Sequence, residues 1–223
     1  MTSYDSDKLA AEIGSRLEKL TDKSTKGIRT FRRELSRRLA SESSDFVYLL
    51  SLQLLETRET VHPFFAYELV QHHREASRGL NSKKLEQLGE GISSWSEVDT
   101  FACYLSGPAW RERQVPDSLI ARWARSKNRW WRRAAVVSTV PLNNKARGGQ
   151  GDAIRTLQIC QLVVHDRDDM VVKALSWALR ELSKRDSKAV KTFLNKNKHS
   201  LASRVVREVN NKLETGLKNP TKL

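Results

Sequence analysis

The amino-acid sequence predicts an all-α protein. Apolar residues recur at the three- and four-residue spacing of a helix face along nearly the whole chain, which is the pattern of amphipathic helices. No stretch shows the strict alternation of a β-strand. Short segments also repeat, because WRRAAVV at 131–137 superposes on VVKALSW at 171–177 with a shift of 40 residues. Helix pairs recurring at about 40 residues are typical of α-solenoids of HEAT type.

The first half of the chain contains several helix signals. Residues 46–55 are apolar nearly all round, which predicts a buried helix. A further helix is expected to start near Pro63, because proline is favoured in the first turn. Ser82 is expected to cap a short helix that follows. Two amphipathic stripes precede these elements, at Leu9, Ile13, Leu17 and Leu20 and at Ile28, Phe31, Leu35 and Leu39.

The second half continues the helical pattern. Trp95 and the apolar residues after it form one predicted helix, and Pro116 opens the next. Asn128 and Asp168 are residue types that cap helices, and each precedes an apolar stripe. The segment 141–151, PLNNKARGGQG, is expected to be a polar loop between helices.

These elements predict one HEAT-like repeat domain over residues 1–215, with a frayed tail over 216–223. In such a solenoid, corresponding helices line a concave surface, which the charge of the chain would make basic. Asp99, Arg133 and Lys173 would then occupy equivalent positions on successive inner helices. A plain helical bundle is the alternative fold.

The charge of the chain is unevenly distributed. Residues 1–109 contain 15 Lys and Arg against 16 Asp and Glu, a net charge of −1, whereas residues 110–223 contain 25 against 10, a net charge of +15. A field of that size attracts a polyanion and binds it in a salt-dependent way. The sequence has no basic amphipathic helix with a lipid-facing aromatic side. Nucleic acid is therefore the predicted partner.

Other classes of protein find little support. No run of 18 apolar residues and no signal-peptide pattern is present, so a cytoplasmic protein is expected. Cys103 and Cys160 lie far apart in apolar helical patterns and are expected to be buried thiols. His72 and His73 lack spaced partners for a metal, and GGQG at 148–151 lacks the Lys-Ser/Thr of a phosphate loop. The sequence therefore indicates neither a metal nor an organic cofactor.

Three motifs together resemble a known family. Trp95 and Asp99 are four residues apart, RWWRRAA follows at 129–135, and KALSWALRE follows at 173–181. This combination resembles the bacterial HEAT-like repeat alkylpurine DNA glycosylases, which belong to the DNA alkylation repair enzyme family. The similarity runs from about Gly27 to about residue 210, and Gly27-Ile28-Arg29-Thr30 looks like the early GI-x-T helix start of that family.

The resemblance implies an activity and a role for individual residues. The family removes cationic N3- and N7-alkylated purines from duplex DNA without pulling the base into a deep pocket. Asp99 aligns with the catalytic carboxylate, Trp95 and Trp177 with aromatic walls at the lesion, and Arg133 with an arginine that holds the DNA backbone. Weaker candidates for DNA contact are Arg29, Thr30, Arg33, Arg147, Lys173 and Arg180.

The residue types fit that chemistry without the resemblance. An alkylated cationic purine is a good leaving group, and its departure leaves positive charge on the sugar, which a nearby carboxylate stabilises. Indole rings attract cations by about 0.5–2 kcal/mol, and arginine binds phosphate in a fixed geometry. The alternatives are structural: Asp99 and Arg133 as an ion pair, and Trp95 and Trp177 as core aromatic residues.

One segment departs from the family. Family members often have aromatic residues ahead of the GI turn, whereas SRLEKLTDKSTKGI at 15–28 has none. A second hypothesis is a non-catalytic HEAT-like scaffold that binds damaged or branched DNA, and a protein-binding solenoid is a third. Self-resistance to bulky alkylating natural products is a variant of the glycosylase hypothesis. The predicted protein is a monomer.

Overall fold

The computed structural model describes residues 3–57 and 61–220, and every regular element in these ranges is helical. The all-α prediction is therefore confirmed for this part of the chain. The helices group into two compact units, Met1–Gly91 and Ile92–Leu223, which are described separately. The expectation of a single domain over residues 1–215 stays a prediction.

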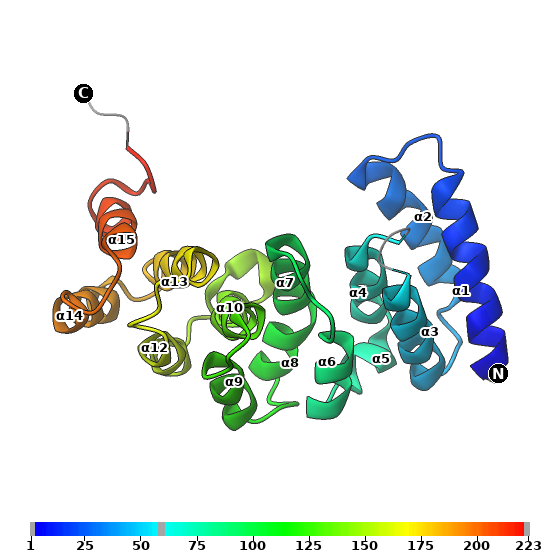
Figure 1. Cartoon of the computed structure of the whole chain (residues 1–223), viewed down its shortest axis with the longest axis horizontal. Helices are drawn as coiled ribbons and strands as arrows, with labels where there is room; N and C mark the ends of the chain where they lie inside the picture. Colours follow the sequence, from blue (N-terminus) through cyan, green and yellow to red (C-terminus); the bar gives the residue numbers. More distant parts are fainter. Residues whose placement is uncertain (1–2, 58–60, 221–223) are drawn as a thin grey trace. The chain divides into compact units, whose positions relative to one another are not determined.

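The N-terminal unit is organised around one apolar helix (Figure 1). Helix α3 packs against α1, α4, α5 and α6, and its Val47, Leu50 and Leu54 are fully buried, as its nearly continuous apolar sequence predicts. The ring centroids of Phe31 and Phe65 lie 5.5 Å apart between α2 and α4. The helices of the unit are α1 (Ser3–Glu18), α2 (Thr25–Arg38), α3 (Ser44–Glu56), α4 (Pro63–His72), α5 (Arg74–Arg78) and α6 (Ser82–Leu88).

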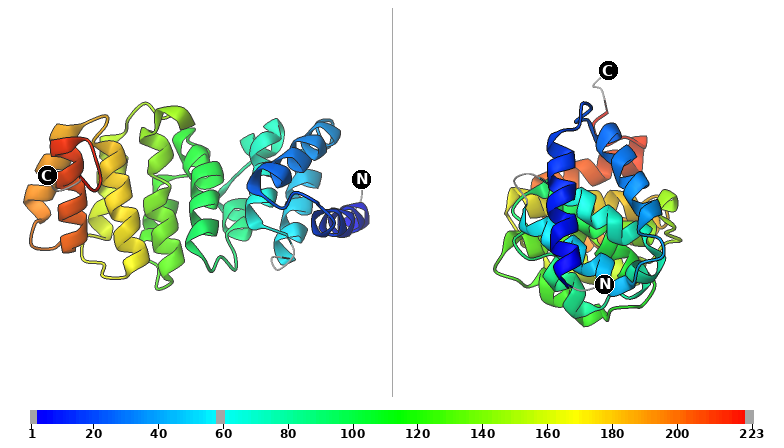
Figure 2. Two further views of the ribbon diagram at one scale, coloured as in Figure 1. Left: turned by 90° about the horizontal axis from the view of Figure 1, so that it is seen from above. Right: turned by 90° about the vertical axis from the view of Figure 1, so that its right-hand side faces the viewer.

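The C-terminal unit contains a row of packed helices. Helix α7 packs on α10, α10 packs on α13, and α13 packs on α15, and the view from above in Figure 2 shows them following one another along the unit. The elements of the unit are α7 (Trp95–Phe101), the π-helical η1 (Ala102–Ser106), α8 (Gly107–Arg111), α9 (Asp117–Ala124), α10 (Arg129–Val137), α11 (Val140–Asn143), the 3₁₀ helix η2 (Lys145–Arg147), α12 (Ala153–Leu162), α13 (Asp169–Leu182), α14 (Ser187–Asn197) and α15 (Ser203–Thr215).

Most of the helix starts were predicted correctly. Pro63 begins α4, the Asn128 side chain accepts a hydrogen bond from Trp130 N at the start of α10, and Asp168 does the same for Met170 N at α13. The prediction for Ser82 was wrong by one residue. Asn81 caps α6, because its side chain accepts from Lys84 N, and an amide oxygen serves this purpose as well as a hydroxyl.

The predicted loop at 141–151 is partly helical. Its first residues belong to α11, and residues 145–147 form η2. Pro141, Leu142 and Asn143 are buried, and the Asn143 side chain donates to the Thr139 carbonyl and to Thr156 Oγ1. Polar side chains of this segment bond to helices of the same unit, so polarity alone gave a misleading signal.

Two further features of this part of the chain are the length of its apolar helices and the state of its cysteines. None of the helices in the described ranges combines the length and the apolarity needed to cross a lipid bilayer. Cys103 and Cys160 are free and buried, and burial raises the pKa of both thiols to about 12. Neither thiol is therefore set up as a nucleophile.

Candidate active site

The start of α7 is fixed by a capping box. Glu97 N donates to Ser94 Oγ, and Glu97 Oε2 accepts from the backbone N–H groups of Ser93 and Ser94. These reciprocal bonds satisfy N–H groups that the first turn leaves without helical partners. Trp95 is thereby the first residue of the helix, and Asp99 follows one turn later on the same face.

Arg133 on α10 binds the carboxylate of Asp99 in a bidentate ion pair. Its Nε lies 2.9 Å from Oδ1 and its Nη2 lies 2.8 Å from Oδ2. Its remaining nitrogen, Nη1, donates to the carbonyl of Met170 at the start of α13. The side chains of Arg133 and Asp99 are 6% and 19% exposed. One guanidinium therefore connects three consecutive helices of the row and holds Asp99 in one orientation.

Two opposing effects act on the pKa of Asp99. Removal of the carboxyl group from water raises it, whereas the hydrogen bonds and charge of Arg133 lower it. The desolvation is the larger effect, so the pKa of Asp99 is raised above its ordinary value. A raised pKa beside a specific charge partner is common at functional sites, although structural ion pairs show it too.

Asp99 lines a pocket of about 200 Å³ within the C-terminal unit. Three other residues singled out from the sequence line the same pocket, namely Trp95, Trp177 and Arg147. They come from α7, α13 and η2, which are far apart in the chain. The other lining residues are Ser96, Thr100, Cys103 and Tyr104. The structure therefore brings the predicted acid and both predicted tryptophans together.

The two tryptophans differ from the core aromatic residues. Trp95 is 58% exposed and Trp177 is half-buried, whereas Trp110 and Trp123 are buried. Packing the core therefore does not account for Trp95.

A π-helical turn begins at Ala102, three residues after Asp99. Gly107 N donates to the carbonyl of Ala102, five residues earlier. Pro108 explains the wide turn, because it has no N–H to donate and its ring would clash with the carbonyl four residues before it in a regular α-helix. Glycine at position 107 allows the π-turn to pack closely against the end of α10. A Cβ at this position would lie 2.7 Å from the carbonyl oxygen of Ala102 and 2.8 Å from that of Ser138.

The π-turn explains why Tyr104 was missed. In a regular helix with 100° per residue, Tyr104 would lie about 140° round the axis from Asp99 and away from it. The wider turn brings Tyr104 into the same pocket. Of the other missed lining residues, Cys103 follows Asp99 by four residues, so helical spacing did signal its position.

Arg147 lies over the ring of Tyr104, with its Cζ 5.2 Å from the ring centroid. Arg111 donates to the Arg147 carbonyl, and Gly148 ends η2 with φ of 80°, a left-handed conformation that glycine adopts without strain. Among the described residues, no carboxylate lies within ion-pair distance of the Arg147 guanidinium. Arg147 thus presents an uncompensated positive charge at the pocket.

Lys173 and Arg180 lie on α13 but do not line the pocket. Lys173 is exposed and pairs with Asp169 at 2.6 Å. Arg180 Nε donates to Ser176 Oγ at 3.2 Å, and burial lowers the pKa of its guanidinium against the opposing charges of Glu208 and Glu181. With Trp177 between them, Lys173 and Arg180 continue one helix face at spacings of four and three residues.

The remaining sequence candidates belong to the N-terminal unit. Arg29 Nε lies 2.7 Å from Glu68 Oε1. Arg33 Nη2 donates to Thr30 Oγ1, which donates to the Lys26 carbonyl. All three lie on α2, whose start is capped by Ser24 three residues before Gly27. Arg29, Thr30 and Arg33 therefore share one helix of that unit, with Arg29 paired to α4 and Arg33 bonded to Thr30.

Metal chemistry receives no support from the residues described. In residues 3–57 and 61–220, no three His, Cys, Asp or Glu side chains gather as metal ligands do. His73 instead accepts a hydrogen bond at Nδ1 from Ala76 N and so caps α5. The pocket is lined by carboxylate, indole, phenol and guanidinium groups, together with the hydroxyls of Ser96 and Thr100 and the thiol of Cys103.

Comparison with known proteins identifies the family. No curated protein matches the chain. The family model described as DNA alkylation repair enzyme matches residues 18–213, which is most of the chain and includes every residue that lines the pocket. The family predicted from the tryptophan, aspartate and arginine motifs is confirmed, and the chain belongs to the DNA alkylation repair enzyme family.

Proposed function

We propose that the protein is a monofunctional DNA glycosylase that hydrolyses the N-glycosidic bond of cationic N3- and N7-alkylated purines in duplex DNA. The observation that carries the proposal is the convergence of Asp99, Trp95 and Trp177 on one pocket, with the carboxylate held by Arg133. The family supplies the substrate class, because its members repair alkylated DNA.

Asp99 stabilises the charge that develops on the sugar. An N3- or N7-alkylpurine already carries a positive charge, so it departs without an acid to protonate it. Its departure leaves an oxocarbenium-like deoxyribose, which a carboxylate fixed nearby stabilises electrostatically. The same carboxylate positions the attacking water. The bidentate contact from Arg133 keeps Asp99 in place, so little reorganisation is needed during the reaction.

The aromatic residues form the walls at the lesion. Trp95 and Trp177 line the pocket from two helices, and Tyr104 lines it from the π-turn. Aromatic faces attract a cationic base or sugar by about 0.5–2 kcal/mol each. The pocket volume of about 200 Å³ and the exposure of Trp95 suit contact with a nucleotide at the surface rather than enclosure of an extruded base.

The two arginines have different roles in this proposal. Arg133 is a positioning residue, because all three of its nitrogens donate within the protein and its side chain is only 6% exposed. Arg147 binds a DNA phosphate beside the lesion, because its charge is uncompensated and it lines the pocket. The sequence had suggested Arg133 for the backbone contact, and the proposal transfers that role to Arg147.

The row α7, α10, α13 and α15 is proposed to be a HEAT-like repeat array that binds the DNA duplex. Trp95, Arg133, Lys173 and Trp177 all lie on helices of this row. The net charge of +15 over residues 110–223 supplies the attraction to phosphate. Lys173 and Arg180, on either side of Trp177 along α13, are proposed backbone contacts. Arg29, Thr30 and Arg33 are proposed contacts from the N-terminal unit.

Base release from methylated duplex DNA tests the proposed activity. The expected products are free 7-methylguanine and 3-methyladenine, with abasic sites left in an unbroken strand. Strand cleavage without added alkali would contradict the monofunctional assignment. Salt-dependent binding to duplex DNA without release of either base, or of a bulky N7 adduct, would contradict the enzyme and favour the scaffold hypothesis.

A further inference from the structure

We propose that the groove formed by helices α9, α12 and α14 of the C-terminal unit is a docking site for an acidic amphipathic helix of a partner protein. The groove has a volume of about 960 Å³, and its exposed lining surface is mainly apolar, with Ile154, Leu157 and Phe193 among the lining residues. It shares no lining residue with the pocket at Asp99. The inference therefore goes beyond the proposed glycosylase activity and does not depend on it.

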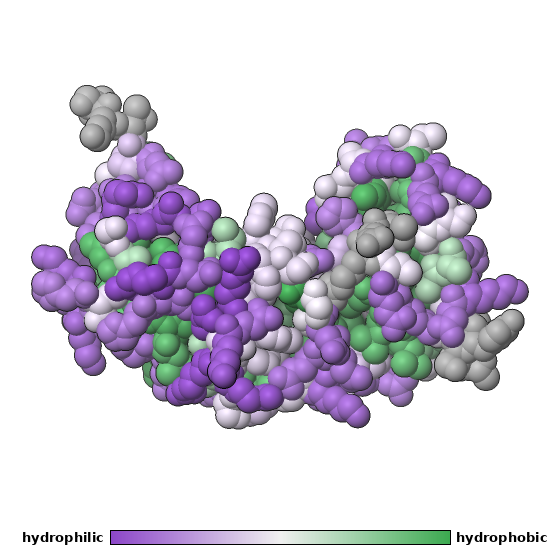
Figure 3. All heavy atoms as spheres, in the orientation of Figure 1, coloured by the Kyte–Doolittle hydropathy of each residue, from purple (hydrophilic) through white to green (hydrophobic). Residues whose placement is uncertain are grey.

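Helix α12 presents an outward stripe along the floor of the groove. Ile154, Leu157, Gln158, Gln161 and Leu162 all line it, at the spacings of one helix face. Ile154 is 75% exposed, the highest value among the large apolar residues that the structure describes. Figure 3 shows a hydrophobic patch at the place that α12 occupies in Figure 1, with hydrophilic side chains around it.

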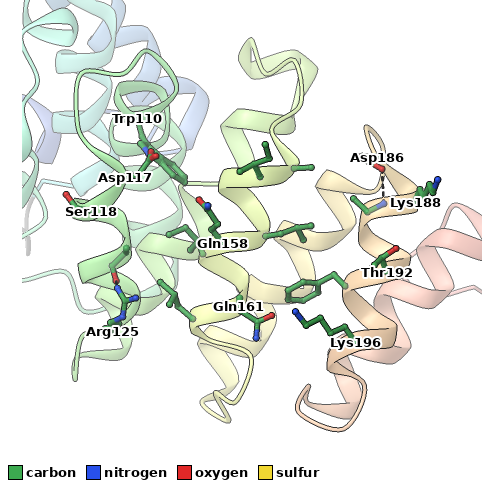
Figure 4. A pocket seen from close by; sticks show the side chains of 18 residues that line it. Trp110, Asp117, Ser118, Arg125, Gln158, Gln161, Asp186, Lys188, Thr192 and Lys196 are labelled. Carbon is green, nitrogen blue, oxygen red and sulfur yellow. Dashed lines mark hydrogen bonds between the residues drawn. The ribbon is translucent and has the colours of Figure 1, made fainter.

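The neighbouring helices supply two walls. Ser118, Ala121 and Arg125 lie at three- and four-residue spacings along α9, and Ala189, Thr192, Phe193 and Lys196 do so along α14. Figure 4 shows the labelled side chains of these helices on either side of α12. A trough with helical walls and an apolar floor fits an amphipathic helix that inserts residues at i, i+3, i+4 and i+7. Ten residues of α12 give it a length of about 15 Å.

The charges of the rim indicate the sign of the partner. Arg125 and Lys196 lie at the same end of the groove, where Lys196 points toward α12 (Figure 4). Within the described part of the chain, neither has a carboxylate at ion-pair distance. The lining as a whole contains three basic residues, Arg125, Lys188 and Lys196, against two acids, Asp117 and Asp186, and Asp117 also lies 3.7 Å from Arg113. The unbalanced charge is therefore positive, and a helix with carboxylates at the Arg125 and Lys196 end is complementary.

A labelled peptide of about 15 residues tests the proposal, since such a peptide is marginally helical alone and can fold in the groove. It has leucines at i, i+3, i+4 and i+7 and glutamates on the flanks, and a scrambled peptide of the same composition is the control. Fluorescence anisotropy with the full chain is expected to give a Kd of about 10 μM for the patterned peptide, with the scrambled peptide at least about tenfold weaker.

Two exposed substitutions locate the binding. Ile154→Glu and Lys196→Glu are each expected to weaken the patterned peptide by about tenfold. Lys191→Glu, on the same helix as Lys196 but outside the groove lining, is expected to leave it unchanged. Circular dichroism and thermal melting confirm that all three variants fold.

Four results would overturn the proposal. The first is equal binding of the patterned and scrambled peptides, and the second is no binding of the patterned peptide. The third is an affinity for the patterned peptide that Ile154→Glu leaves unchanged. The fourth is displacement of the peptide by duplex DNA, together with a loss of DNA affinity in Ile154→Glu. Sedimentation of the free chain as a dimer that Ile154→Glu dissociates would likewise replace the partner helix by a second copy.

Discussion

Arg133 donates to both carboxylate oxygens of Asp99, at 2.9 and 2.8 Å, while its third nitrogen donates to the carbonyl of Met170. One side chain on α10 thus connects the acid on α7 to the start of α13, the helix that carries Trp177. A buried charge-assisted hydrogen-bond network therefore fixes the position of Asp99 relative to the helix that carries Trp177.

Arg133→Lys tests this positioning role. Lysine keeps the charge but cannot make the bidentate contact, so we expect single-turnover excision to fall by about 10²-fold through misplacement of Asp99. The salt dependence of DNA binding should not change, because Arg133 is not assigned to a phosphate. The matched control is Arg132→Lys, whose guanidinium pairs with Asp166 outside the pocket and whose excision rate should be close to that of the wild type.

Arg147→Ala tests the phosphate contact. Loss of one such contact is expected to weaken binding to any duplex and to reduce the slope of log K against log[salt] by about 1. Lys145→Ala, an exposed residue of the same 3₁₀ helix that does not line the pocket, is the control and should affect excision less. An unchanged salt slope in Arg147→Ala would remove Arg147 from the DNA interface.

Trp95→Ala separates function from packing. Because Trp95 is 58% exposed, its removal should change the free energy of unfolding by no more than about 0.5 kcal/mol, while excision falls by about tenfold or more through loss of an aromatic wall. Trp123→Ala, in the buried cluster with Phe101 and Trp131, should instead destabilise the protein by about 3–5 kcal/mol. Equal destabilisation by both substitutions in denaturant titrations would assign Trp95 to the core.

The pH dependence of excision follows from the state of Asp99. In the proposed reaction Asp99 acts as the ionised carboxylate, so the rate should fall as the pH falls through the pKa of Asp99. Burial raises that pKa, so the acidic limb should lie above the ordinary aspartate value of about 3.9. The raised pKa also means that the contribution of Asp99 to stability is complete below the unfolded-state pKa and is lost as the pH rises through the folded-state pKa.

Single-turnover rates with protein in excess over 7-methylguanine duplex measure this limb. Binding measured at each pH separates protonation of Asp99 from weaker association. A rate that stays constant down to about pH 4 would contradict the assignment. If the residual excision rate of Asp99→Asn falls with pH in the same way as that of the wild type, a group other than Asp99 causes the fall.

Local sequence signals predicted several residues of the candidate site. The four-residue spacing of Trp95 and Asp99 and the caps at Asn128 and Asp168 depend only on neighbours in the chain, so helix geometry determined them. Tyr104 escaped prediction because the π-turn at Pro108 changes the helical phase. The position of Arg147 depends on tertiary contacts, among them the bond from Arg111 to its carbonyl, and no local spacing encodes it.

Asp99→Asn tests the central claim most directly. The amide oxygen can accept only one of the two hydrogen bonds from Arg133, and the amide carries no charge to stabilise the sugar cation. Release of 7-methylguanine and 3-methyladenine should therefore fall by at least about 10²-fold with duplex affinity retained. Asp169→Asn is the matched control and should excise at nearly the wild-type rate. It removes an exposed carboxylate at the start of α13, which pairs with Lys173 of the same helix and with Arg204 of α15. Full activity of Asp99→Asn, or an equal loss in both variants, would contradict catalysis by Asp99.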